Sequence, residues 1–450
     1  MVEMRNTTST RNAKKRILFA LLTDYYLFNY SRDLVNQLVR DDFIVTILAH
    51  DVNVAARINE YGLDVTVICL PSPIRWAANR SGNALMRFAL WLGIKYWVYK
   101  QKNNFDFAIV PWDYRVIWHQ ISKAITSLTI HNTTDFIDIE LKLERSYLSR
   151  IESESFKHKF WLAIDNIFGG KLLPRANGRI LKYGKSWLID RLCGYRGPNG
   201  HQGFSGIRYL TVTGDQVRRN YQSLGVGVYP NPTEIVVTGS PNYEFLNNTK
   251  LQKLDETTLL KKLGIPSSGF RLFTFFLSPS SFTNVQVQEI VEVVSTLAKS
   301  RLDIWFVLKF HPKTRQGDPE KIRKALDCVD DRLTIITAVT GDEWNATLIR
   351  ASSCLVQKQS TVGFIAMAME VPIISYNLRE TNYDDDMYKI LGGSFHSESV
   401  EQLLDNLQLI ECEEGRRELR ERQRRSMSQF CKIEGSACAR ISCVIKEHFS

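Results

Sequence analysis

The stretch Cys354-Leu-Val-Gln-Lys-Gln-Ser-Thr-Val-Gly-Phe-Ile-Ala-Met-Ala-Met-Glu-Val-Pro-Ile-Ile-Ser-Tyr-Asn377 decides the fold. An apolar run at 354–356 is followed by a polar turn, a helix-forming segment at 362–369 and a second apolar run at 372–376. Strand, turn, helix and strand in this order predict a βαβ unit of a parallel sheet. The turn then lies at a strand's carboxyl end and a helix's amino end, where free N–H groups favour an anion.

Three side chains of this polar turn suit a phosphate group. Ser360 and Thr361 offer hydroxyl groups, and Lys358 offers a positive charge. The same residue types also cap helices that bind no ligand. The turn by itself therefore leaves two interpretations open, a structural cap and an anion site.

A second candidate turn follows the segment 304–310, which predicts a buried strand. Pro312 ends this strand because proline cannot donate to a sheet ladder. Lys309 and His311 flank the strand's end, so both could contact the anion expected at the Ser360 turn. A solvated loop histidine is the alternative interpretation.

These residues carry a family resemblance. The Lys-x-His-Pro strand end at 309–312, the Ser-Thr turn at 360–361 and the Pro-Ile-Ile-x-Tyr run at 372–376 resemble the nucleotide-binding half of certain GT-B glycosyltransferases. The families concerned are the bacterial capsule Kdo transferases, the polysialyltransferases and the CDP-glycerol glycerophosphotransferases. The resemblance implies that His311, Ser360 and Thr361 bind the donor nucleotide and its phosphate, with Lys309 and Lys358 beside them.

The loop after the predicted strand at 272–277 belongs to the same expected donor side. It carries Ser280 and Ser281, which we assign to donor binding. In the non-hydrolysing UDP-sugar 2-epimerases the equivalent strand leads into a loop that contains His and Arg. The absence of a histidine between 278 and 284 counts against epimerase chemistry.

The N-terminal half predicts a second series of alternating strands and helices. Strands are expected at 16–22, 43–49, 65–70, 105–110 and 127–130. No Gly-x-Gly-x-x-Gly follows the first strand, so no NAD or FAD site is predicted there. By the resemblance, the loop after the first strand faces an interdomain cleft and brings Asp24 and Asn29 near an acceptor.

The polar loop at 131–140 is the expected source of a catalytic base. An inverting transferase needs a carboxylate or a histidine to take the proton of the acceptor hydroxyl. Asp135 and Asp138 are candidates by position, and His131 is assigned to the acceptor side.

The whole pattern predicts an α/β protein with a GT-B-like fold, in which two Rossmann-like domains with parallel sheets face an interdomain cleft. The expected divisions are a disordered basic tail at 1–14, an acceptor domain at 15–246 with an irregular basic insertion at about 141–206, a nucleotide-sugar-binding domain at 259–430 and a C-terminal helix at 431–450. Two strand exits, 211–214 and 236–241, resemble the end of the first domain in GT-B transferases and epimerases. The tail 432–445 resembles the close of related enzymes.

Composition narrows the classes of partner. The chain of 450 residues has a formal charge of +10, which suits nucleic acid, an anionic membrane surface or phosphorylated substrates, and no nucleic-acid-binding signature occurs. The eight scattered cysteines form no Cys-x-x-Cys pair, which favours reduced thiols in a cytoplasmic location. The positive charge adds the inner face of the cytoplasmic membrane as an expected place. The basic, aromatic segment 83–102 predicts a long helix that lies on a membrane surface or packs on a sheet.

We therefore expect an inverting, metal-independent glycosyltransferase of capsule or other surface polysaccharide biosynthesis. Its donor would be a CMP-sugar such as CMP-Kdo, or alternatively a UDP-sugar, and its acceptor a growing polysaccharide or a lipid-linked glycan. The nucleotide sugar is a substrate, and no cofactor is expected. The alternatives are a CDP-glycerol-type glycerophosphotransferase, an enzyme like the UDP-sugar 2-epimerases, and an inactive glycan-binding module.

Overall fold

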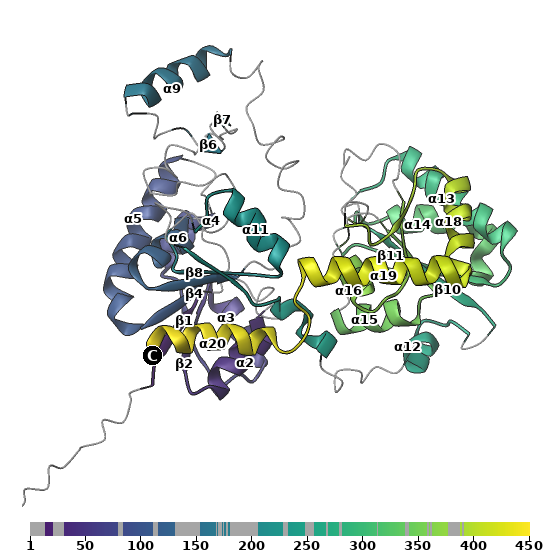
Figure 1. Ribbon diagram of the computed structural model, residues 1–450. Helices are drawn as coiled ribbons and strands as arrows, with labels where there is room; N and C mark the ends of the chain where they lie inside the picture. Colours follow the sequence, from purple (N-terminus) through teal and green to yellow (C-terminus); the bar gives the residue numbers. More distant parts are fainter. Residues whose placement is uncertain are drawn as a thin grey trace, which may run out of the picture.

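The computed structural model describes most of the two predicted series of strands and helices. The described residues are 14–20, 31–79, 84–110, 116–130, 154–167, 169, 173, 175–176, 179–180, 206–227, 233–247, 256–266, 269–278, 281–312, 314–337, 342–357, 360, 362–376, 388 and 391–450. Figure 1 shows them in two lobes, the first mainly purple to teal and the second mainly green to yellow, with the yellow C-terminal helix lying against the first lobe.

The first lobe is built on a seven-stranded parallel sheet with the order β3-β2-β1-β4-β5-β8-β9. The strands are β1 Arg16–Phe19, β2 Ile44–Ala49, β3 Thr66–Cys69, β4 Phe107–Val110, β5 Ser127–Ile130, β8 Tyr209–Val212 and β9 Glu234–Val237. The helices are α2 Arg32–Arg40, α3 Val52–Glu60, α4 Ser72–Asn79, α5 Ala84–Gln101, α6 Val116–Ala124, α9 Phe156–Ile167 and α11 Asp215–Ser223. The short strands β6 Arg175–Ala176 and β7 Arg179–Ile180 pair with each other in an antiparallel fashion.

The second lobe is built on a six-stranded parallel sheet with the order β12-β11-β10-β13-β14-β15. The strands are β10 Arg271–Leu277, β11 Ile304–Phe310, β12 Leu333–Ile336, β13 Cys354–Gln357, β14 Ile373–Tyr376 and β15 Phe395–Ser397. The helices are α12 Glu256–Lys262, α13 Asn284–Ser300, α14 Asp318–Ala325, α15 Asp342–Ala351, α16 Val362–Ala368, α18 Val400–Glu411 and α19 Glu413–Phe430. The last helix, α20 Ala437–Phe449, follows them in the chain but packs on the first lobe.

The predicted βαβ unit is present as β13, α16 and β14, and its two strands pair in parallel. The predicted α/β class with two Rossmann-like sheets is confirmed. The strand β15 and the helix α18 were not anticipated, because a three-residue Phe-His-Ser segment carries no apolar run of its own and becomes a strand by pairing with β14. The proposed domain boundaries stay predictions.

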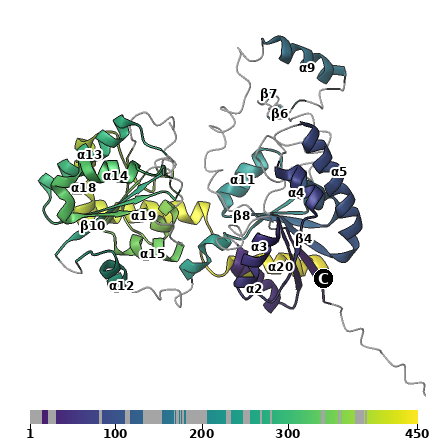
Figure 2. The same cartoon turned by 180° about the vertical axis from the view of Figure 1, so that it is seen from behind.

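Both sheets are covered by helices on both faces, which explains why their strands are almost continuously apolar. In the first lobe, α2, α3 and α20 pack on one face and α4, α5 and α6 on the other. In the second lobe, α13, α14 and α18 cover one face and α12, α15 and α16 the other. The C-terminal helix α20 thus belongs to the core of the first lobe although α19 packs on the second (Figures 1 and 2).

The chain returns to the first lobe through a close backbone contact. The amide of Lys432 donates to the carbonyl oxygen of Thr213 at 2.7 Å, and the Thr213 hydroxyl donates to the carbonyl oxygen of Phe430 at 2.8 Å. A Cβ on Gly214 would lie 2.4 Å from the carbonyl carbon of Phe430. Only glycine therefore fits where the strand exit at 211–214 meets the tail.

The second strand exit meets the same tail. Gly239 has φ +77°, and a Cβ there would lie 2.3 Å from the carbonyl oxygen of Lys432. The Arg440 guanidinium donates to the carbonyl oxygens of Thr238 and Glu434, both at 2.7 Å. The three segments that the sequence singled out by resemblance are therefore in direct contact.

A carboxylate of the first lobe holds the docked helix α20. Asp41 accepts hydrogen bonds from Ser442 at 2.5 Å, from Lys446 at 2.7 Å and from Gln37 at 2.9 Å. Burial by itself would raise the pKa of Asp41, but these donors outweigh it and lower the pKa from 3.8 to about 2.

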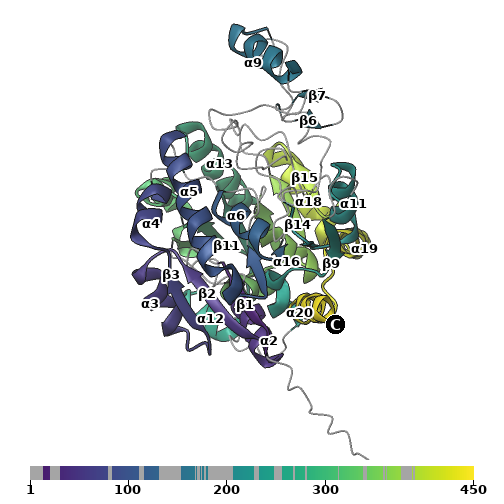
Figure 3. The ribbon, with the colours of Figure 1, turned by 90° about the vertical axis from the view of Figure 1, so that its left-hand side faces the viewer.

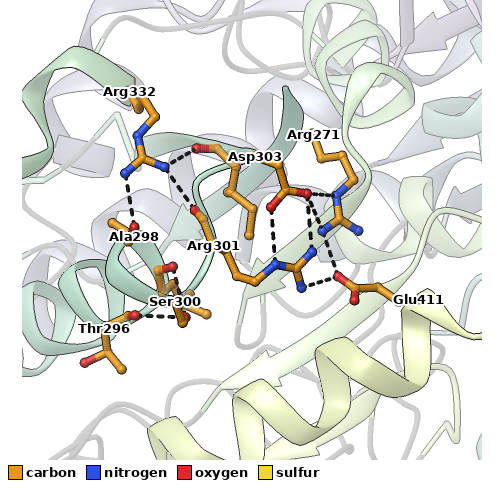
Figure 4. A network of polar contacts seen from close by, with 10 residues as sticks. Arg271, Thr296, Ala298, Ser300, Arg301, Asp303, Arg332 and Glu411 are labelled. Atoms are coloured by element: carbon orange, nitrogen blue, oxygen red, sulfur yellow. Dashed lines mark hydrogen bonds and ion pairs between the residues drawn. The ribbon is translucent and has the colours of Figure 1, made fainter. Parts of the chain in front are cut away.

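A network of charged side chains lies at the amino ends of β10 and β11, at the end of the second sheet opposite the strand exits (Figure 4). Arg271 and Arg301 both contact Glu411 at the end of α18, at 2.8 and 2.5 Å, and both contact Asp303 at the start of β11. The Arg332 guanidinium donates to carbonyl groups at the end of α13. The amino ends of β10 and β11 are thereby tied to two covering helices, away from the strand exits.

We predict that Asp41→Asn destabilises the protein by about 2 kcal/mol at neutral pH, because a pKa lowered by nearly two units stabilises the folded state by that amount. Since the folded pKa lies below the unfolded one, this contribution is present above about pH 4 and is lost as the pH falls towards about 2. Urea denaturation of wild type and variant across that range measures it.

The neighbouring Asp42→Asn change is the matched control. It removes the same charge from a carboxylate whose side chain is exposed and pairs with Lys14, so its effect should stay within about 0.5 kcal/mol. Equal losses in the two variants, or an Asp41→Asn effect that persists unchanged in acid, would contradict the assignment.

Candidate active site

The strand order reverses once in each sheet, and ligands of open α/β sheets bind at such a point. In the first sheet the reversal lies between β1 and β4, and the loops that follow these strands lie outside the described residues. In the second sheet it lies between β10 and β13. The loops after β10, β11 and β13 are partly described, and they carry the predicted donor side.

A row of side chains crosses the second sheet just before these loops. Lys309 on β11 pairs with Phe276 on β10, and Phe276 pairs with Gln357 on β13. Paired residues of parallel strands project to the same face, so the three side chains share the face covered by α12, α15 and α16. Lys309 and Gln357 lie two strands apart, which is about 10 Å.

Lys309 is a buried amine for which the described residues offer no counter-ion. It is 5% exposed, and its Nζ lies 6.0 Å from the centroid of the Phe276 ring. Among the described residues it makes no ion pair, and burial lowers its pKa. A buried unpaired ammonium group is unfavourable, and an anion bound beside it would remove that cost.

Gln357 is the second buried donor of the row. It is 3% exposed, and its Oε1 accepts a hydrogen bond from the amide of Ser360 at 2.8 Å. This bond orients the side-chain amide, because only the oxygen can accept it. The Nε2 group is buried and has no hydrogen-bond partner within the described part of the chain. Buried donors of this kind are rarely left unsatisfied in a folded protein.

The turn at Ser360 is held from two sides. Its amide is bound by Gln357, and its carbonyl oxygen accepts hydrogen bonds from the Tyr388 hydroxyl and, at 3.0 Å, from the amide of Gly363. A Cβ on Gly363 would lie 2.2 Å from the ring of Tyr388, which is fully buried. The helix α16 has seven residues, so an anion there would be bound chiefly by individual donors and less by a helix dipole.

The described end of the loop after β10, residues 281–283, is also held by contacts. The amide of Phe282 donates to the buried carboxylate of Asp318 at 3.1 Å, and the Phe282 ring packs against Phe310 at 5.7 Å. Thr283 and Gln286 then form a capping box that begins α13. This arrangement leaves Ser281 exposed at the strand exit.

His311 lies where the sequence placed it, outside the core and directly after β11. Its amide donates to the carbonyl oxygen of Leu277 at 3.0 Å, and its side chain is exposed. Lys309 differs from the expectation of a side chain around the strand end, because it projects into the helix-covered face.

The structure describes four of the predicted site residues, Lys309, His311, Ser281 and Ser360, and all four lie at or next to the carboxyl end of the second sheet. The other predicted residues lie outside the described part of the chain: Asp24, Asn29, His131, Asp135, Asp138, Ser280, Lys358 and Thr361. No group of His, Cys, Asp or Glu within the described part could hold a metal ion.

Sequence reasoning missed three residues of this region. The sequence predicts Gln357 only as part of the polar turn, although a polar residue at the end of a buried strand is a usable signal. Tyr388 lies far along the chain, and nothing local relates it to Ser360. Glu289 of α13, also buried, accepts a hydrogen bond from the Tyr376 hydroxyl at 3.1 Å and sits within an apolar helical pattern.

No protein-family model and no curated protein sequence matches the chain. Solved structures do resemble it in fold. A UDP-GlcNAc 2-epimerase from Methanocaldococcus jannaschii has a TM-score of 0.57 at 12% identity, with 97% of this chain and 100% of that chain covered. The wall teichoic acid polymerase TagF has a TM-score of 0.53 at 11% identity, with 96% of this chain and 89% of that chain covered. The calicheamicin glycosyltransferase CalG4 has a TM-score of 0.51 at 11% identity, with 97% of this chain and 98% of that chain covered. At these identities the likeness shows a GT-B-like fold.

We predict that Lys309→Met stabilises the ligand-free protein by about 1–3 kcal/mol at neutral pH, because it replaces an unpaired buried amine with an apolar side chain of similar length. The pKa of Lys309 is lowered, so its charged form is penalised in the folded state. The gain should therefore shrink as the pH rises towards the unfolded value near 10.5.

Urea denaturation at neutral and alkaline pH measures this gain. Lys261→Met on the exposed face of α12 removes the same charge in water and should change stability by less than about 0.5 kcal/mol. A loss of stability in Lys309→Met at neutral pH would show that the amine has a stabilising partner.

We predict that Gly363→Ala destabilises the protein by about 1–3 kcal/mol, because the new methyl group must displace the buried Tyr388 ring. Ala368→Gly, at the end of the same helix α16, is the control that tests whether this helix tolerates substitution in general. A Gly363→Ala protein of wild-type stability would contradict the close packing of Tyr388.

Proposed function

We propose that the chain is a GT-B-type glycosyltransferase that moves a sugar from a nucleotide sugar to a growing surface polysaccharide or a lipid-linked glycan. The observation that carries this proposal is the pair of buried polar side chains beside the strand-order reversal of the second sheet. Among the described residues Lys309 makes no ion pair, and the Nε2 group of Gln357 has no hydrogen-bond partner. A phosphorylated nucleotide is the class of ligand that such a position and charge suit.

The proposed roles divide between the two lobes. On the donor side, His311 and Lys309 stabilise the negative charge of the departing nucleotide phosphate, and the Ser360–Thr361 turn with Lys358, Ser280 and Ser281 binds its oxygens. This stabilisation takes the place that a metal ion has in other transferases. On the acceptor side, Asp135 or Asp138 accepts the hydroxyl proton, with Asp24, Asn29 and His131 orienting the acceptor.

The donor we favour is a CMP-sugar such as CMP-Kdo, with a UDP-sugar as the second choice. This order rests on the sequence resemblance to capsule transferases. In an inverting transfer the acceptor oxygen attacks the anomeric carbon, the bond to the nucleotide phosphate breaks, and the proton passes to the carboxylate base.

A CDP-glycerol-type glycerophosphotransferase is the second candidate, supported by the shared fold of TagF and the shared motif order. It would release CMP and form a phosphodiester, whereas a glycosyl transfer leaves no phosphorus in the product. A 2-epimerase activity is supported by fold likeness alone, and the loop at 278–284 lacks the expected histidine. An inactive glycan-binding module would bind glycan and turn over no nucleotide sugar.

The most informative experiment is a thermal-shift screen against CMP, CDP, UDP and GDP. A ligand at a hundredfold excess over its dissociation constant stabilises the folded state by about 2.7 kcal/mol, which is readily measured. The proposal expects one nucleotide to stabilise the wild type and to lose that effect in Lys309→Met. Product analysis with the matching donor, including a phosphorus assay, then separates transfer, phosphotransfer and epimerisation.

We predict that His311→Ala lowers turnover about a hundred- to a thousandfold without changing the melting temperature, because one preorganised donor to the leaving group is lost from an exposed position. His396→Ala is the control, since His396 lies on the edge strand β15 of the same sheet and pairs with Glu398. Near-normal turnover by folded His311→Ala protein would remove His311 from the mechanism.

A further inference from the structure

Helix α5 of the first lobe is apolar on two opposite faces. Its inner face, with Leu90, Ile94, Trp97 and Val98, is buried in the core that α4 and α6 share with the sheet. A helix that packs on a sheet ordinarily turns a polar face to water. The outer face of α5 does not follow this rule.

The outer face carries a stripe of large apolar side chains. Phe88, Leu92, Tyr96 and Tyr99 follow at helical spacing, and their exposed fractions are 45%, 48%, 66% and 67%. Figure 3 shows α5 on the outer side of its lobe, facing the viewer. A contiguous exposed stripe of this kind marks an interaction surface more often than a solitary exposed residue does.

Basic side chains accompany the stripe. The Nζ atoms of Lys95, Lys100 and Lys102 lie 5.1, 5.7 and 5.2 Å from the ring centroids of Trp91, Tyr96 and Tyr99. The sequence from 84 to 102 contains no Asp or Glu. The face therefore combines aromatic rings with uncompensated positive charge, which complements an anionic partner.

A second helix repeats the pattern. In α9 the exposed residues Phe156, Phe160 and Ile167 lie on one face, flanked by the exposed Lys157 and Lys159. In all three views α9 lies beyond one end of α5, on the outer side of the first lobe (Figures 1–3). Two helices of the first lobe thus carry the same combination of exposed apolar and basic side chains.

We propose that the outer stripe of α5, assisted by α9, docks the protein on the surface of an anionic lipid bilayer. Aromatic rings enter the boundary between head groups and acyl chains, while lysine side chains reach the lipid phosphates. A nucleic-acid surface would leave the apolar Leu92 without a partner, whereas an acyl-chain boundary can bury it together with Phe88. No described helix is long and apolar enough to cross a membrane, so the contact is peripheral.

This docking gives the proposed transfer reaction a geometric advantage, since a lipid-linked acceptor is presented at the same surface. The docking itself requires no nucleotide and no turnover. Its failure and a failure of the proposed chemistry are therefore distinguishable in separate assays.

The test is co-sedimentation of the full chain with vesicles of phosphatidylglycerol and phosphatidylcholine, compared with vesicles of phosphatidylcholine alone. We expect strong binding to the mixed vesicles at low salt and much weaker binding to the neutral ones. Charge-dependent binding should fall steeply with salt, because the attraction decays within a Debye length of about 10 Å at 0.1 M.

Two triple variants divide the contributions. Replacing Lys95, Lys100 and Lys102 by Gln should lower partitioning roughly a hundredfold, since each basic residue near an anionic surface contributes about a factor of five. Replacing Phe88, Tyr96 and Tyr99 by Ser should abolish the binding that remains at high salt. Unchanged melting temperatures and circular dichroism confirm that both variants are folded.

Matched controls lie on the second lobe. Lys261→Gln, Lys262→Gln and Lys299→Gln remove the same net charge, and Phe270→Ser, Leu302→Ser and Leu409→Ser remove three exposed apolar side chains. Both controls should bind like the wild type. Equal binding to the two kinds of vesicle, no binding to either at low salt, or a loss in the controls as large as in the α5 variants would each overturn the proposal.

Discussion

The close contact between the tail and the two strand exits of the first lobe is the constraint on which the rest of the arrangement depends. Backbone meets backbone where Gly214 and Gly239 face the segment 430–432, and hydrogen bonds from Thr213 and Arg440 fix the approach. Because a side chain at either glycine would enter the partner backbone, this junction has little room for variation. It places α20 in the core of the first lobe while α19 stays on the second.

The candidate site depends on a different constraint, the order of the strands. Reversal of the order between β10 and β13 brings the exits of β11, β10 and β13 side by side. Lys309 and Gln357 are buried just beneath these exits. Among the described residues Lys309 has no ion-pair partner, and Gln357 Nε2 has no hydrogen-bond partner. The sheet thus tolerates a local cost in stability at the place where a ligand would relieve it, which is common at functional sites.

The proposed membrane contact and the candidate nucleotide site lie on separate parts of the chain. The stripe on α5 is built from surface residues whose inner neighbours hold the first core, so the surface can change without loss of the fold. The side chains of Lys309, Phe276 and Gln357, in contrast, lie within a core face of the second lobe. Substitutions there are expected to change both the stability of the protein and its affinity for a nucleotide. The two proposals therefore respond differently to substitution.

The sequence by itself determined the α/β class, the βαβ unit at 354–376, the position of most strands and the exposed place of His311. It could do so because buried parallel strands are continuous apolar runs and because proline and polar turns end them locally. It also pointed to the two strand exits and the tail, but only as separate motifs. The tertiary structure was needed to show that these three segments touch and that the Tyr388 ring packs against Gly363. It was also needed to show that Lys309 is buried on the same sheet face as Gln357 and that α5 carries apolar side chains on both faces. Each of these facts depends on contacts between residues far apart in the chain, or on which face of a strand or helix is covered by other elements. The periodicity of one segment contains no information about such contacts or about such coverage.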